Sequence, residues 1–156
     1  MNKEIQEIAA SMQDVLTGNP WYGKPVLEIL NSVNQEKVYE KLNGESHSMI
    51  ELLYHMITWV EFTFQRLEKN QNYDPDANES LDWRQTNYEL HTWNNGVADF
   101  TAGTNKIINL LQASSDSLLD EKVEFRHYNF RVLLNGLIQH NIYHIAQIAF
   151  LDKSLS

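Results

Sequence analysis

Almost every long segment of this chain carries apolar residues at intervals of three and four, which places them on one face of an α-helix. Helices with such stripes bury them by packing against one another. The 156 residues suffice for one domain with a sizeable core and are too few for two. We therefore predict an all-α fold, a four-helix bundle with short extra helices, formed as a single domain over residues 1–156.

Residues that start and stop helices divide this pattern into segments. Ser48 and Glu51 have the spacing of a capping box, and Asn129 can cap the last helix. The polar stretch NQNYDPDANES reads as a connection that is long for a compact bundle. The long helices are expected at about residues 3–16, 48–69, 83–112 and 130–152, with short ones at 25–30 and 35–42.

The composition argues against several classes of protein. With 21 acidic and 12 basic residues the net charge is -9, and no dense cluster of Lys and Arg offsets it, so a nucleic-acid partner is not expected. No apolar run approaches the length of a membrane span, and the N-terminal stretch lacks the pattern of a secretory signal. Cysteine is absent, which rules out disulfides and a cysteine nucleophile and fits a cytoplasmic protein.

Two histidines lie four residues apart in the apolar run LLNGLIQHNIYHIAQIAFL. On a helix of about 100° per residue, His140 and His144 lie about 40° apart, on the same face as Leu137 and Gln147. Two imidazoles so placed can reach one cation, because neighbours at this spacing are about 6 Å apart. The alternative is a pair of core histidines satisfied by hydrogen bonds, and the pair alone does not decide between them.

A third histidine changes this balance. His55 lies in ELLYHMITWVEFTF on the apolar face of its predicted helix, where Trp59 and Phe62 would wall a pocket. A single inward histidine is usually an ordinary core residue, but one that faces an inward pair completes a set of three neutral nitrogen ligands. Helical bundles build metal sites in this way, from side chains on facing helices.

The other three histidines fit a site less well. His91 falls on the outer face of the predicted third helix and is expected in solvent. His47 precedes the capping box and His127 precedes the last helix, so either could approach the mouth of a site.

The stretch SHSMIELLYHMITWVEF, followed some eighty residues later by YNFRVLLNGLIQHNIYHIAQIAFLDK, resembles the DinB-like (damage-inducible) family, and the PWYGKP loop and the chain length agree. This resemblance implies an up-down-down-up bundle with a long crossover between the second and third helices, often a homodimer. It also implies a divalent metal held by His55, His140 and His144. The family often has Gly-Gln after the last histidine, where this chain has Ile145-Ala146-Gln147.

Three imidazoles leave an open coordination position, which is the ligand count of catalytic zinc. That position can hold a water of lowered pKa or deprotonate a thiol. Relatives in the superfamily include transferases and isomerases that use low-molecular-weight thiols. We therefore expect a divalent-metal-dependent S-transferase in which a metal-bound thiolate attacks an electrophilic substrate. The alternatives are a hydrolase using metal-bound water and a non-catalytic metal-binding stress-response dimer.

Zinc and nickel are the first candidates for the ion, and iron, manganese and copper also suit histidine ligands.

Three further side chains are candidates for catalytic roles. Gln147 shares the face of His144 and could orient a metal-bound ligand, or it could be a buried glutamine bonded to backbone. Glu51 lies one turn before His55 and could accept a proton, although the capping box already accounts for it. Tyr143 could donate to a substrate or simply pack.

A second apolar face lies almost opposite the two histidines of the last helix. A helix with apolar residues on both sides is buried on both sides. We expect this face to form a homodimer contact, with packing inside the chain as the alternative. Its residues are Leu134, Ile138, Ile142, Ile145 and Ala149.

Overall fold

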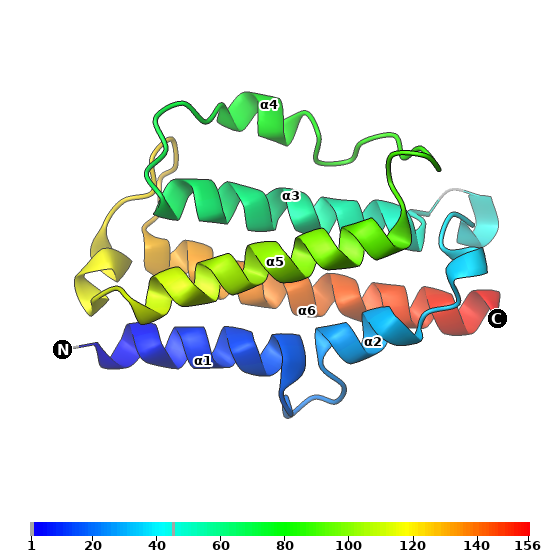
Figure 1. Cartoon of the computed structure of the whole chain (residues 1–156), viewed down its shortest axis with the longest axis horizontal. Helices are drawn as coiled ribbons and strands as arrows, with labels where there is room; N and C mark the ends of the chain where they lie inside the picture. The colour runs from blue at the N-terminus through cyan, green and yellow to red at the C-terminus, as the bar shows by residue number, and fades with distance from the viewer. Residues whose placement is uncertain (1, 45) are drawn as a thin grey trace.

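The computed structural model describes residues 2–44 and 46–156, and within these ranges the long elements are all helices. Four of them lie side by side as a bundle (Figure 1). They are α1 (Lys3–Thr17), α3 (Met49–Leu67), α5 (Trp93–Gln112) and α6 (Phe130–Leu155). The short elements are α2 (Val26–Ser32), α4 (Pro75–Glu79) and the 3-10 turns Gln35–Lys37, Leu42–Gly44 and Asp116–Asp120. The predicted all-α four-helix bundle with short extra helices is confirmed.

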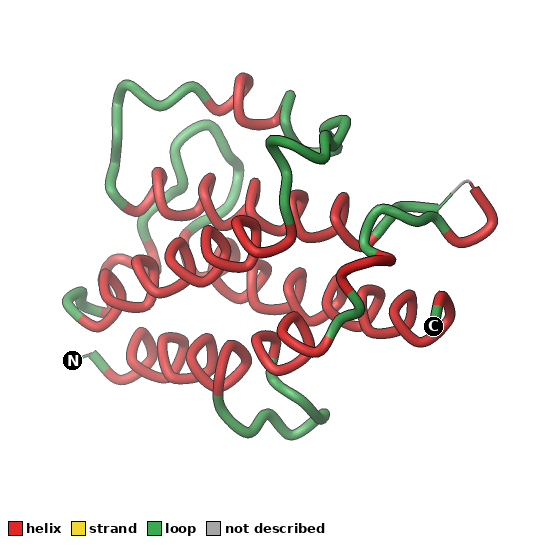
Figure 2. Tube along the Cα trace, turned by 45° about the vertical axis from the view of Figure 1, so that its right-hand side comes forward, coloured by secondary structure: helices red, strands yellow, loops and turns green. Residues whose placement is uncertain are grey.

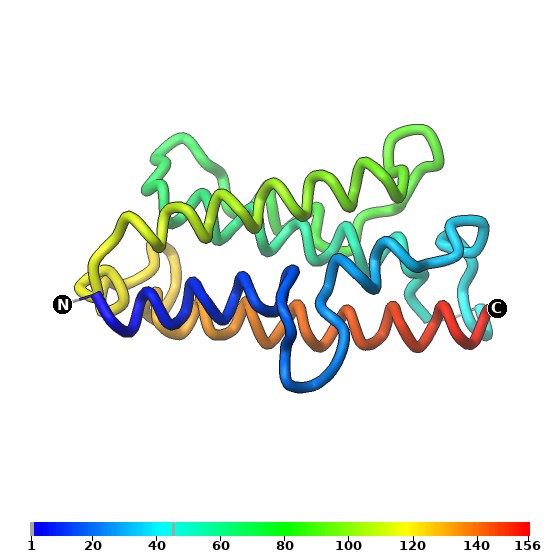
Figure 3. The backbone as a smooth tube through the Cα atoms, turned by 60° about the horizontal axis from the view of Figure 1, so that its bottom comes forward, coloured from blue at the N-terminus to red at the C-terminus, as the bar shows by residue number. Residues whose placement is uncertain are grey.

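The order of helix directions is up-down-down-up, as the resemblance implies. In Figures 1 and 3, α1 and α6 run away from the end of the bundle that holds the N-terminus, and α3 and α5 run towards it. Because α3 and α5 are parallel, residues 68–92 must return along the whole bundle. This crossover carries α4 along the outside of α3 and is otherwise loop (Figure 2).

The predicted start of the third helix at Trp83 is wrong by ten residues. The helix α5 begins at Trp93, after Thr92 caps it by accepting a hydrogen bond from the Asn95 backbone N–H. Before it, the Asn87 side chain accepts from the backbone N–H of Glu89, and Asn87 N–H itself donates to the His91 ring. Such side chain to backbone bonds compete with a helix, so the crossover is longer than predicted.

Other helix boundaries follow the sequence signals closely. Ser48 and Glu51 form the predicted capping box at the start of α3, and Asn129 caps α6 through the Val132 backbone N–H. The predicted short helix over residues 35–42 is wrong. The 3-10 turn Gln35–Lys37 forms at the start of this range, and a second 3-10 turn, Leu42–Gly44, begins at its end.

The parallel pair α3 and α5 approaches closely at two glycines of α5. A Cβ atom at Gly96 would lie 2.7 Å from Leu53 Cδ2, and one at Gly103 would lie 2.7 Å from Val60 Cγ1. Both distances are too short for a methyl group, so these two positions need glycine for packing.

The apolar face of α6 that was predicted to form a dimer contact is largely buried inside the chain. Leu134, Ile138 and Ile145 are at most 9% exposed. Packing within the chain therefore accounts for most of this face. The homodimer remains a prediction, and this face does not support it.

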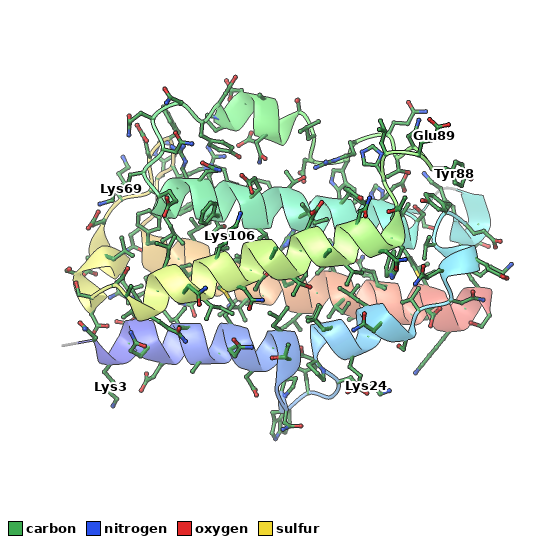
Figure 4. All side chains as sticks on the ribbon, in the orientation of Figure 1. Lys3, Lys24, Lys69, Tyr88, Glu89 and Lys106 are labelled. Atoms are coloured by element: carbon green, nitrogen blue, oxygen red, sulfur yellow. The ribbon has the colours of Figure 1, made fainter. Side chains whose placement is uncertain are left out.

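Two features of the structure bear on the nucleic-acid and membrane partners that were not expected from the sequence. Figure 4 shows the labelled Lys3, Lys24, Lys69 and Lys106 on separate parts of the molecule, so these cations do not combine into one basic patch. Within the described residues, none of the helices has the length and hydropathy that a membrane crossing requires.

Candidate metal centre

The three histidines predicted as ligands meet between α3 and α6. His55 Nε2 lies 3.0 Å from His144 Nε2 and 2.9 Å from His140 Nε2. Among the described residues these three side chains form a group able to hold an ion, with ligand atoms within 4.8 Å of one another. The spacing of four residues brings the α6 pair onto one face, and the inward face of α3 supplies the third ring.

Burial makes all three rings neutral at neutral pH. Loss of solvent lowers the pKa of His55 and of His140 to about 4, and it also lowers the pKa of His144. Neutral imidazole is the form that binds a metal, because one of its nitrogens keeps a free lone pair.

Hydrogen bonds fix which nitrogen carries that lone pair in two of the rings. His55 Nδ1 lies 2.6 Å from Asp82 Oδ1, and His144 Nδ1 lies 2.5 Å from Gln147 Oε1. Both oxygens are acceptors, so each Nδ1 carries the proton and each Nε2 is an acceptor. The two Nε2 atoms therefore face each other at 3.0 Å with no proton between them.

This arrangement fits a bound cation better than a hydrogen-bonded core. Two acceptors at this distance repel, whereas a metal ion would use both lone pairs. Two nitrogens bound to one zinc ion at the usual bond lengths lie about 3.3 Å apart. The donor set in this chain therefore suits a divalent metal ion, which His55, His140 and His144 could hold.

The third ring is held differently. His140 Nδ1 is buried and has no hydrogen-bond partner among the described residues. Its ring packs edge-on against His144, with centroids 4.4 Å apart, and against Trp59 at 6.5 Å. Ring packing contributes to the orientation of His140, while His55 and His144 each have an oxygen at Nδ1.

The crossover supplies two residues of the site that the sequence did not reveal. Asp82 accepts the hydrogen bond of His55, and the Trp83 ring stacks on His55 at 3.8 Å with the rings 8° from parallel. His47 stacks on Trp83 in the same way at 3.7 Å, so Trp83 lies between two imidazoles. Arg84 fastens this segment to α3 by donating to Thr58 Oγ1.

Asp82 matters because a metal-binding histidine usually donates its second N–H to a carboxylate or carbonyl. Burial raises the pKa of Asp82, while Trp59 and the nearby charges oppose that rise. No pattern in the sequence distinguishes Asp82 from the other acidic residues of the crossover. The only indication that such a residue exists is that each inward histidine generally needs a hydrogen-bond acceptor at Nδ1.

The structure places the three candidate catalytic residues in different surroundings. Gln147 contacts His144, and Tyr143 is 63% exposed with its ring 5.0 Å from that of His144. Glu51 is engaged elsewhere, by Ser48 N–H and Lys41. Burial raises the pKa of Glu51, but these two partners outweigh it and hold the pKa below its usual range.

The remaining predictions for the histidines have mixed outcomes. His91 is half-buried in the crossover and packs edge-on against Tyr54, so its predicted place in solvent on a helix is wrong. His47 approaches the site through Trp83, as was considered possible, and His127 is exposed.

Two cavities lie along α6, and one of them is lined by a histidine of the cluster. Trp59 and His140 line one of them, as predicted for Trp59, whereas Phe62 is fully buried in the core and lines neither. The other cavity, of about 620 Å³, is bordered by His47, Tyr143 and Gln147 among others. A small molecule can therefore reach the cluster through the first cavity at His140, whereas the second cavity borders the cluster only through Gln147, which bonds to His144.

Fold and site together define a helical bundle with a candidate three-histidine metal centre. A family model described as the DinB superfamily matches residues 24–148, a span that holds all three histidines. The chain belongs to the DinB superfamily, which confirms the resemblance drawn from the sequence. A comparison with curated proteins finds no match.

Proposed function

We propose that this protein is a divalent-metal-dependent enzyme that transfers an electrophilic group to the sulfur of a small-molecule thiol. The observation that carries the proposal is the convergence of three neutral imidazoles without a fourth ligand from the chain among the described residues. Structural zinc sites are usually closed by four protein ligands, whereas catalytic sites keep a position open. Zinc and nickel are the ions proposed first.

The chain's own residues supply positioning. His55, His140 and His144 would hold the ion, Asp82 orients His55, and Gln147 orients His144. A divalent ion held by neutral ligands supplies Lewis acidity, which lowers the pKa of a coordinated thiol or water. Three neutral ligands leave the positive charge of the ion uncompensated, and this favours an anionic sulfur.

The nucleophile must come from a second molecule, because the chain has no cysteine. In the transfer, the sulfur of the thiol forms a bond to an electrophilic carbon, and the leaving group departs with the bonding electron pair. The thiol proton passes to solvent. The cavity lined by His140 and the larger cavity lined by Gln147, which bonds to His144, give room for two molecules, as a two-substrate reaction requires.

The test is turnover of 1-chloro-2,4-dinitrobenzene by tag-free protein loaded with zinc or nickel, with and without small thiols. Chloride release is followed for the wild type, for His144→Ala, and for His127→Ala as a control at an exposed histidine outside the cluster. We expect thiol-dependent turnover that His144→Ala abolishes and His127→Ala retains.

Two other outcomes would contradict the proposal. Turnover of ester or amide substrates that does not depend on thiol would identify the hydrolase alternative. Absence of turnover with every thiol, together with unfolding when the metal is removed, would identify a structural ion in a non-catalytic metal-binding protein.

A further inference from the structure

A glycine in the middle of α6 has no structural reason to be glycine. Glycine in a helix interior destabilises the helix by about 1 kcal/mol relative to alanine. Gly96 and Gly103 on α5 are explained by the close approach of α3. At Gly136, a Cβ atom would meet nothing within 4 Å, and its φ is not in the left-handed region.

Gly136 is exposed and lines a cavity of about 250 Å³ that is open to solvent and reaches the histidine cluster at His140. Two helices and the loop before α6 form it, since α3 contributes Trp59 and Thr63, α6 contributes Gly136 and its neighbours, and the loop contributes Tyr128. His140 belongs both to the cavity wall and to the cluster, so an occupant of the cavity lies beside the candidate metal ion.

The walls of this cavity are mostly apolar and carry no charged side chain, although the lining includes Tyr128. The Thr63 hydroxyl already donates to the Trp59 carbonyl at 2.8 Å, so it offers no free donor. Lys, Arg, Asp and Glu are absent from the described lining, and the other walls include Val132 and Leu137. Such walls favour a neutral, apolar occupant.

We propose that this cavity binds a compact aromatic group of the electrophilic substrate, and that Gly136 keeps the cavity open. This inference rests on the proposed function and names the class of its electrophile. An apolar cavity of about 150 Å³ accommodates benzene, so the cavity beside His140 has room for a ring with a short substituent. The Trp59 indole provides an aromatic wall for that ring.

The test is binding of fluorobenzene, followed by fluorine NMR, to the metal-loaded protein without thiol. The variant is Gly136→Leu, whose side chain would project into the cavity. Leucine is a good helix former and meets no atom at the Cβ position, so the fold is expected to be retained. The control is Gln139→Leu, an exposed position on the same helix that does not line the cavity.

We expect saturable binding to the wild type and to Gln139→Leu, and an affinity at least about tenfold weaker in Gly136→Leu, because the new side chain occupies the space of the ring. Equal affinities in all three proteins, or no saturable binding to the wild type up to the solubility limit of fluorobenzene, would overturn the inference. Thermal unfolding of each protein verifies that the variants are folded.

This experiment separates the inference from the proposed function. Fluorobenzene binding requires neither a thiol nor a reaction, so it can succeed in a protein that shows no transferase activity. Conversely, thiol-dependent turnover without fluorobenzene binding would leave the proposed function standing and remove the assignment of this cavity.

Discussion

Replacing Asp82 by asparagine should weaken metal binding without unfolding the bundle. The carboxylate accepts the Nδ1–H of His55 at 2.6 Å, which fixes the ring with Nε2 towards the other two histidines. It also places a negative charge behind the ligand and makes the imidazole a better donor to a cation. Asparagine keeps the size of the side chain but removes the charge and offers an N–H group that competes for the same position.

The expected loss follows from this contact. Removing the acceptor behind a metal-binding histidine typically reduces metal affinity about 10- to 100-fold, which is about 1.4 to 2.7 kcal/mol. We place Asp82→Asn in that range because the hydrogen bond is short and its acceptor is charged, and such bonds are about twice as strong as neutral ones. Gln147→Ala removes a neutral acceptor from His144 and should have a smaller effect.

The assay is a competition titration of zinc between the tag-free protein and a chromophoric chelator. Glu89→Gln is the matched control, because it removes the same charge from an exposed position in the same crossover (Figure 4). An Asp82→Asn affinity within about twofold of both wild type and control would refute the reasoning, since it would mean that the carboxylate does not act on the ligand.

Three further predictions concern stability and are measured by urea denaturation of metal-free protein. Because the pKa of His55 and His140 is about 4 in the fold against 6.5 ordinarily, these two histidines take up protons only in the unfolded chain as the pH falls from 7 towards 5.5. Unfolding free energy should therefore fall by about 2 kcal/mol from about pH 7 to pH 5.5, and a flat profile would contradict this. Ser48→Ala should cost about 1 kcal/mol through loss of the α3 cap, whereas no change would show that the cap is dispensable. Gly103→Ala should cost about 1 to 3 kcal/mol because its methyl group would clash with Val60, and a stabilised variant would disprove that close approach.

The features of this fold that could be predicted are those with a local cause. The apolar periodicity marked the long helices, and the capping residues Ser48 and Asn129 marked two of their starts correctly. The start of α5 was missed because the segment before Trp93 contains residues that suit either a helix or a turn. Its conformation depends on contacts such as those of Asn87 with His91 and of Trp83 with His55, which a helical pattern does not show.

The site could be predicted in part for a similar reason. The three histidines share inward faces, so the periodicity of α3 and α6 was enough to bring them together. Asp82 and Trp83 reach the cluster only because the crossover returns over α3, so their role depends on the tertiary path of a loop. The face predicted for a dimer contact is mostly covered within the chain, because periodicity shows that a face is apolar but not which surface covers it.

The most direct test of the metal centre is the metal content of tag-free protein, measured by inductively coupled plasma mass spectrometry on the wild type and on His144→Ala. Protein without a histidine tag is needed because the tag itself binds divalent ions. We predict about one divalent ion per chain in the wild type and its loss in the variant, as expected for a site with three ligands of which one has been removed. A wild type that holds no ion, even after reconstitution with zinc, nickel, iron, manganese and copper, would contradict the account and leave the three histidines as core residues.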